Sequence, residues 1–219
     1  MLDGVHRFES GKFGKFESLF QHLADDGQHP HTLFIACCDS RVLAELITQS
    51  RPGDLFVVKN IGNIVPENQV GGPNSTAAAI EFAVNKLEVK NIVVCGHSQC
   101  GAMEALMADD FEESCKKGHL GEWIRLAEPV RQTILEKYSY LDTPEKRCTA
   151  AGEENVLFGL ENLESYECIA RRLAEGKMHL YGWFFHIKQV KMYAYNPESR
   201  QFEPIVAPGG IDAVPEVMR

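Results

Sequence analysis

Residues 91–101 read NIVVCGHSQCG, an apolar run of strand length that breaks at a glycine and continues into polar residues. Two runs of the same kind precede it in the chain, LFIAC at 33–37 and LFVVK at 55–59. Because these runs are apolar without alternation, both faces of the strands should be covered, which is typical of a parallel sheet. The three segments therefore predict an α/β fold with a mainly parallel central β-sheet.

Segments with helical spacing separate these strands and should flank the sheet. The sequence predicts helices at residues 13–24, 42–48, 75–87, from 101 on, 123–138 and 149–174, and closing strands at 180–186 and 190–195. Ser75 is the expected cap of the helix that follows it. Since no linker or repeat interrupts the chain, we expect one domain over residues 1–219.

Composition excludes several kinds of partner. The net charge of −9 and the pI near 5.4 argue against binding to a phosphate backbone, so we expect no nucleic acid partner. No apolar run has the length of a membrane span, and the N-terminus lacks the apolar stretch of a signal peptide. We therefore expect a cytoplasmic protein without a membrane partner.

The seven cysteines are an odd number and are scattered along the chain, which does not suggest a disulfide framework. Cys37 ends the first predicted strand, His97 follows the third, and Cys100 lies on the next turn. If the two strands are neighbours, these side chains converge on a zinc site with three protein ligands and an open fourth position. The plainer alternative is two core cysteines and a turn histidine, but the HxxC spacing favours a metal. We assign the remaining cysteines to packing: Cys38, Cys95, Cys115, Cys148 and Cys168.

Two motifs carry a resemblance to a known family. Residues 37–41, CCDSR, and residues 96–101, GHSQCG, resemble the CxDSR and GHSxCG signatures of the β-class carbonic anhydrases. The segments RPGDLF at 51–56, NIGN at 60–63 and LYGW at 180–183 fall in register with that family. The resemblance thus extends over nearly the whole chain.

This resemblance implies reversible hydration of carbon dioxide to bicarbonate by a zinc-bound hydroxide. One Zn²⁺ per subunit would be held by Cys37, His97 and Cys100, and activity should rise toward alkaline pH. Asp39 would orient the hydroxide in the open state and become a fourth metal ligand in a closed state, while Arg41 keeps its carboxylate off the zinc. Without the resemblance, Asp39 could simply cap the following helix.

The resemblance also implies a substrate pocket shared between subunits. Gln28 would donate a hydrogen bond to substrate, and Phe56, Ile61 and Phe82 would line the pocket. Their plainer interpretations are an exposed loop residue and three core residues. Because parts of this pocket come from the adjoining subunit in the family, we expect a homodimer or a dimer of dimers. The apolar stripe of the helix at 13–24 should pack on the neighbouring subunit.

Three positions depart from what relatives carry. Lys59 replaces an arginine, Phe82 a tyrosine, and Phe34 a tryptophan that some relatives use, with arginine and tyrosine, to bind bicarbonate as an inhibitor. We therefore predict a constitutively open enzyme. The spacing selects no proton shuttle among the histidines His29, His31, His119, His179 and His186.

Other interpretations stay open at this point. A non-catalytic zinc module would have no use for the Asp39 and Arg41 pair, and a thiol redox protein would need the CxxC spacing that is missing here. A relative that hydrolyses another small linear substrate, such as carbon disulfide, would share the metal site. The pathway and the role of the loop at 109–122 are not indicated by the sequence.

Overall fold

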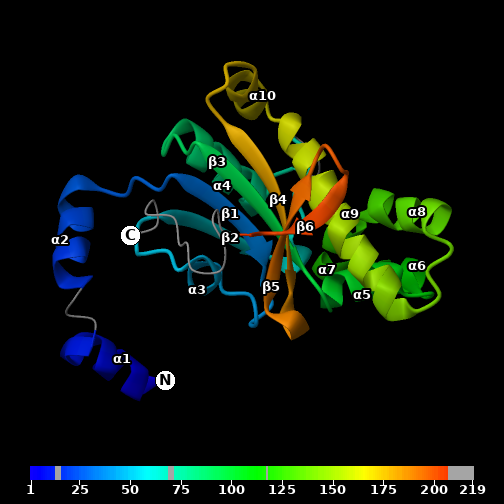
Figure 1. The fold of residues 1–219 in the computed structure, drawn as a ribbon, viewed down its shortest axis with the longest axis horizontal. Coiled ribbons are helices and arrows are strands. Elements are labelled where there is room, and N and C mark those ends of the chain that lie inside the picture. Colours follow the sequence, from blue (N-terminus) through cyan, green and yellow to red (C-terminus); the bar gives the residue numbers. More distant parts are fainter. Residues whose placement is uncertain (13–15, 69–71, 117, 207–219) are drawn as a thin grey trace.

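One mixed sheet forms the centre of the computed structural model, which describes residues 1–12, 16–68, 72–116 and 118–206 (Figure 1). Its strand order is β2-β1-β3-β4-β5-β6. The first four strands in this order are parallel, and β5 and β6 are antiparallel additions. The strands are β1 (Thr32–Cys37), β2 (Leu55–Asn60), β3 (Asn91–His97), β4 (His179–His186), β5 (Lys191–Asn196) and β6 (Gln201–Pro204). The predicted α/β fold is confirmed.

The sheet topology determines where a ligand site belongs. The chain leaves β1 toward one side for β2, and β3 lies on the other side of β1, so the strand order reverses at β1. Ala36 is in register with Cys95, so the carboxyl ends of β1 and β3 lie at the same level. Parallel sheets of this kind bind ligands beyond the carboxyl ends at such a point.

Helices cover the sheet and extend beyond one side of it (Figure 1). They are α1 (Leu2–Arg7), α2 (Glu17–Asp26), α3 (Ala44–Thr48), α4 (Ser75–Asn85), α5 (Gly101–Met107), α6 (Phe111–Ser114), α7 (His119–Arg125), α8 (Glu128–Lys137), α9 (Pro144–Glu164) and α10 (Glu167–Ala174). Strand alternation divides the core: Leu33 and Ile35 pack toward α4 and α9, whereas Phe34 and Ala36 belong to the opposite face. A third apolar cluster joins α5, α7, α8 and α9.

The structure corrects several helix boundaries. Asn74, not Ser75, caps α4, because its Oδ1 accepts from the backbone N–H of Thr76 at 2.9 Å. The helix predicted at 123–138 is two helices, and Pro129 in the first turn of α8 explains the break, since proline cannot continue a helix from the preceding turn. The helix predicted at 149–174 begins at Pro144 instead and is divided before Glu167.

A tertiary contact explains that second division. Tyr166, between α9 and α10, is fully buried, and its hydroxyl donates to the carbonyl oxygen of Pro66 at 3.0 Å. Apolar periodicity continues through this position, so the sequence alone did not indicate a break. Helix α1 and strand β6 were likewise not predicted, and the segment 109–122, predicted as a loop, contains α6 and the start of α7.

An N-terminal arm of α1 and α2 extends away from the sheet (Figure 1). No residue of α2 is buried, and Phe20 keeps 43% of its surface exposed while its ring packs against Phe8 at 6.2 Å. Phe13, part of the predicted stripe, lies outside the described residues. Packing of this arm on a neighbouring subunit stays a prediction. No helix in the described ranges has both the length and the apolar character to cross a membrane.

Candidate metal centre

Three side chains from two strand ends and a helix start meet at the predicted place. One ligand atom each from Cys37, His97 and Cys100 lies within 4.8 Å of the other two, and all three residues are buried. Across the part of the chain that the structure describes, this is the one group of three metal-ligating side chains at such distances. The expected convergence is therefore confirmed.

Local backbone geometry accounts for this convergence. Cys37 is the last residue of β1, and His97 is the last residue of β3, not the residue after it as predicted. Gln99 adopts a left-handed conformation with φ of 58°, and this turn brings Cys100, the N-cap of α5, back toward His97. The HxxC motif thus places two side chains on one turn.

The imidazole of His97 has one nitrogen satisfied and one without a partner. Its Nδ1 donates to the carbonyl oxygen of Ser98 at 2.9 Å, which leaves the lone pair on Nε2. Nε2 is buried and has no hydrogen-bond partner. An unsatisfied buried polar atom costs about 1–3 kcal/mol, and a cation beside the two sulfurs would remove that cost. The donor set fits zinc, which takes imidazole nitrogen and thiolate sulfur.

The two thiols share their protons unequally. The pKa of Cys37 falls well below that of a free thiol, chiefly because the Cys100 thiol donates a hydrogen bond to it, while burial opposes the shift. The same interaction raises the pKa of Cys100. A backbone hydrogen bond from Gly62, whose φ is 75°, also favours the Cys37 thiolate. One thiolate is thus available to a metal, whose binding would release the second proton.

Asp39 and Arg41 form a bidentate pair next to this cluster. The Nε of Arg41 donates to Asp39 Oδ1 at 2.9 Å, and its Nη2 donates to Oδ2 at 2.8 Å. The guanidinium holds the pKa of Asp39 well below its usual range. Helix α3 has Leu43 at its N-cap and no side-chain cap, so Asp39 does not cap it. The expected pair is present, and its carboxylate is turned toward Arg41.

Two further side chains hold this pair, and sequence reasoning did not identify either role. Gln99 accepts from Arg41 through its Oε1 at 3.3 Å and its carbonyl oxygen at 3.2 Å. The ammonium of Lys59 donates to the carbonyl oxygens of Val42 at 2.7 Å and Asp39 at 3.2 Å. Gln99 occupies the variable position of its motif, and Lys59 had been noted as a departure only.

The loop after β2 supplies the other side of the site. Asn155, buried on α9, donates to the carbonyl oxygen of Gly62 at 2.9 Å, and Trp123 Nε1 donates to that of Ile61 at 2.7 Å. Ile61 stays 41% exposed at the carboxyl end of β2. Of the four predicted pocket residues, Ile61 is therefore the one placed at the metal edge of this chain. In the sequence, the available signal for Asn155 was a polar side chain at a helix position among apolar residues.

The other three predicted pocket residues lie elsewhere in this chain. Gln28 is exposed and precedes β1, so the length of that strand separates it from Cys37. Phe56 is in register with Leu33, four residues or about 13 Å from Cys37 along the strand. Phe82 is 45% exposed, and its ring packs against Phe56 at 5.8 Å. The structure does not bring these three to the cluster within one chain.

The remaining cysteines behave differently from one another. Cys95 and Cys115 are buried, in agreement with a packing role, and Cys148 and Cys168 are partly buried. Cys38 is exposed, so the packing interpretation is wrong for it. Its side chain follows Cys37 beyond the end of β1, where strand alternation turns it outward.

Comparison with known proteins supplies the family. A family model described as carbonic anhydrase matches residues 32–192. A carbonic anhydrase of Synechocystis is 41% identical over 198 residues, which cover 90% of this chain and 70% of that protein. Carbonic anhydrase 1 of Escherichia coli is 39% identical over 215 residues, covering 98% of this chain and 95% of that one.

Solved structures agree with the sequence relatives. The β-carbonic anhydrase CcaA superposes with a TM-score of 0.88 at 38% identity, covering 93% of this chain and 97% of its own. One of two tetrameric β-carbonic anhydrases of Sordaria macrospora gives a TM-score of 0.78 at 32% identity, over 88% of this chain and 93% of that one. With its strand order, its buried cysteine and histidine cluster and these relatives, the chain belongs to the β-carbonic anhydrase family.

Proposed function

We propose that this enzyme hydrates carbon dioxide reversibly at a zinc ion held by Cys37, His97 and Cys100. The observation that carries the proposal is the buried, unpartnered Nε2 of His97 beside two thiols, one of them readily ionised. When bound there, zinc would lower the pKa of a water ligand toward neutrality. Membership of the carbonic anhydrase family supplies the reaction.

Asp39 and Arg41 are proposed to orient the attacking water. Both carboxylate oxygens of Asp39 accept from the Arg41 side chain, and Oδ1 also accepts from the Arg41 backbone N–H, so Oδ2 is the oxygen with a lone pair left to accept from the water. That hydrogen bond would direct an oxygen lone pair of the water toward carbon dioxide. Arg41, held by Gln99, would keep the carboxylate away from a bound metal. This pair favours a catalytic site over a structural zinc module.

The substrate pocket is proposed to be completed by a second copy of the chain. Ile61 would line it from the metal-bearing subunit, whereas Gln28, Phe56 and Phe82 would come from the neighbour, since in one chain they lie away from the cysteine and histidine cluster. A dimer or a dimer of dimers, with one zinc per subunit and the α2 arm packed on the partner, provides this arrangement. The tetrameric Sordaria macrospora enzymes support such an assembly.

The open state is proposed to be constitutive. Phe34 is buried with its ring against Trp183 at 5.9 Å, so it offers no polar atom to bicarbonate. The ammonium of Lys59 is engaged by two carbonyl oxygens. An inhibitory bicarbonate site built on these positions is therefore disfavoured. A cytoplasmic location remains a prediction from the sequence, and hydrolysis of carbon disulfide is not favoured because the relatives are carbonic anhydrases.

Stopped-flow measurement of carbon dioxide hydration from near-neutral to alkaline pH tests the proposal. Zinc-loaded protein should hydrate carbon dioxide rapidly, with a rate that rises with pH, and Asp39→Ala should retain zinc but lose most of the activity. Zinc-loaded protein that is inactive at every pH would instead support a structural zinc module.

A further inference from the structure

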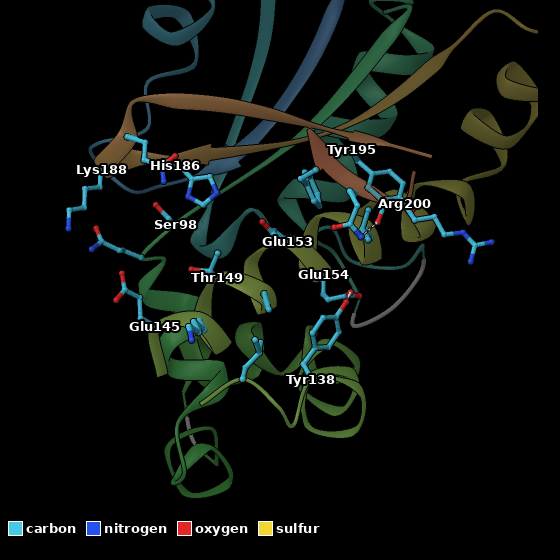
Figure 2. Close-up of a pocket in the computed structure, with 18 of the residues that line it drawn as sticks. Ser98, Tyr138, Glu145, Thr149, Glu153, Glu154, His186, Lys188, Tyr195 and Arg200 are labelled. Atoms are coloured by element: carbon cyan, nitrogen blue, oxygen red, sulfur yellow. Dashed lines mark hydrogen bonds between the residues drawn. The ribbon is translucent and has the colours of Figure 1, made fainter. Parts of the chain in front are cut away.

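A cavity of about 630 Å³ opens between α9, the end of α8 and the β5–β6 hairpin (Figure 2). Its size lies within the range of small-molecule sites, about 300–1,000 Å³. The lining does not include Cys37, His97 or Cys100, and the cavity touches the metal-binding loop through Ser98 and Gln99. The proposed reaction makes no use of this space.

Two consecutive acidic residues of α9 line the cavity. Glu154 accepts a hydrogen bond from the hydroxyl of Tyr138. Glu153 is partly buried, and within the described residues its side chain makes no hydrogen bond or ion pair. Burial, and then the charge of Glu154, raise the pKa of Glu153 to about 7. In its ionised form Glu153 therefore has no compensating cation among the described residues, although its partial burial makes one favourable.

Aromatic rings line the same cavity as these carboxylates. Tyr138 and Tyr140 form one pair, with ring centroids 6.0 Å apart, and Tyr195 and Phe202 form another at 5.6 Å. Figure 2 shows Glu154 beside Tyr138, Tyr195 across the cavity from them, and Glu153 on the side of Thr149 and Ser98. Ring faces attract cations, most strongly where water is excluded. The cavity thus combines unneutralised negative charge with aromatic walls.

The basic residues of the lining form no ion pair with Glu153. They include His186, and burial lowers the pKa of its imidazole, which favours the neutral form. Lys146, Lys188 and Arg200 are exposed, and Lys146 pairs with Asp142 at 2.7 Å. A compact metal ion is also disfavoured, because within the described ranges three metal-ligating atoms gather at the Cys37 cluster and not here. A larger, carbon-bearing cation suits both the volume and the walls.

We propose that this cavity binds a small organic ammonium ion, with its nitrogen against Glu153 and its carbon atoms against the rings of Tyr138, Tyr140 and Tyr195. The exposed amines and guanidinium at the rim leave the inner position to the ligand. This site goes beyond the proposed reaction and does not depend on zinc, so its test and the hydration test can fail separately.

Isothermal titration calorimetry on the full chain at pH 8 tests the site. The probes are choline and its neutral isostere 3,3-dimethylbutan-1-ol, in which carbon replaces the charged nitrogen. We expect choline to bind at one site per chain and the alcohol about tenfold more weakly or worse. Failure of choline to bind saturably, or equal binding of both probes, would overturn the proposal.

Two variants test whether the Glu153 carboxylate carries the charge that binds choline. Glu153→Gln keeps the shape of the side chain and should weaken choline binding about tenfold, since the amide carries no charge. The matched control Glu145→Gln alters an exposed acid of the same cavity and should leave the affinity unchanged. Equal affinity of Glu153→Gln and wild type, or an equal loss in both variants, would contradict the assignment.

A second variant decides the matter if Glu153→Gln does not fold. Tyr140 is 72% exposed, so Tyr140→Leu should not disturb folding. Loss of its ring should weaken choline binding about twofold to fivefold and leave the binding of the alcohol unchanged. An unchanged affinity for choline would count against the aromatic walls and overturn the proposal.

Discussion

The two ends of strand β1 differ in how much of the site one chain provides. At the carboxyl end, Cys37 meets His97 and Cys100, and these side chains are buried. Toward the amino end, Phe82 packs on Phe56 but keeps 45% of its surface exposed, and Gln28 is exposed as well. The proposed metal site is therefore built from a single chain, whereas the proposed substrate pocket requires two.

Replacement of a ligand of the proposed metal site, at the carboxyl end of β1, should have the largest effect. Cys37→Ser should lower zinc affinity more than about 100-fold, beyond the loss typical of outer-shell partners. The measurement is zinc content after dialysis against a graded series of chelator concentrations. Cys38→Ser is the matched control, because Cys38 is the adjacent cysteine and is exposed. Equal zinc loss in the two variants would mean that the cluster does not hold the metal.

The second largest effect should come from a change at Asp39, which separates carbon dioxide hydration from metal binding. Asp39→Asn keeps the size of the side chain but weakens its pairing with Arg41 and its capacity to accept a proton or hydrogen bond. We expect carbon dioxide hydration to fall about 100-fold or more, with zinc content unchanged. Stopped-flow rates and zinc content on the same sample provide the check. If rate and zinc fall together, Asp39 supports the metal instead of the reaction.

The proposed metal site at the carboxyl end of β1 was predictable from the sequence because its signals are local. Cys37 and His97 end apolar strands, and Cys100 follows His97 at a spacing that one turn allows, so adjacency of two strands was the remaining requirement. The Asp39 and Arg41 pair is also local, two residues apart. Such features depend on short stretches of backbone whose geometry the sequence largely determines.

What was missed depends on contacts between distant parts of the chain. Gln99 holds Arg41 across 58 positions, and Asn155 holds Gly62 across 93. The buried Tyr166 divides a helix whose periodicity continues through it. Apolar periodicity cannot report these partners, because it describes which face is buried and not what the buried group meets. The register of a sequence motif likewise cannot show whether Gln28 contributes to the pocket of its own chain or to that of a neighbouring chain.

Complementation between chains addresses that last question. Gln28→Ala should lower hydration about tenfold with zinc retained, because one hydrogen bond to substrate is lost. Coexpression with Cys37→Ser should restore activity, since each mixed dimer then has one site with intact metal ligands and the partner's Gln28. Coexpression of Cys37→Ser with Cys100→Ser is the control, because its mixed dimer has no intact metal site. Activity no higher than the sum of the parents would place Gln28 outside the shared pocket.

Substitution of Glu153 should give the smallest effect. This residue lies on α9, away from both ends of β1. Burial raises its pKa to about 7, so the folded state binds more protons than the unfolded state between pH 4.5 and 7. The stability that the protonated Glu153 carboxyl contributes is then fully present below pH 4.5 and is lost as the pH rises through 7. Glu153→Gln removes this dependence and should be more stable than wild type at pH 8 by about 1–3 kcal/mol.

Urea unfolding of both proteins at pH 5 and pH 8 measures this difference. The gain should be larger at pH 8 than at pH 5, where the Glu153 carboxyl of the folded wild type is mostly protonated. Zinc content should not change, because Glu153 is not one of the three clustered ligands. A gain of equal size at both pH values would show that the amide packs better than the acid, and that the charge of Glu153 is already neutralised in the folded protein.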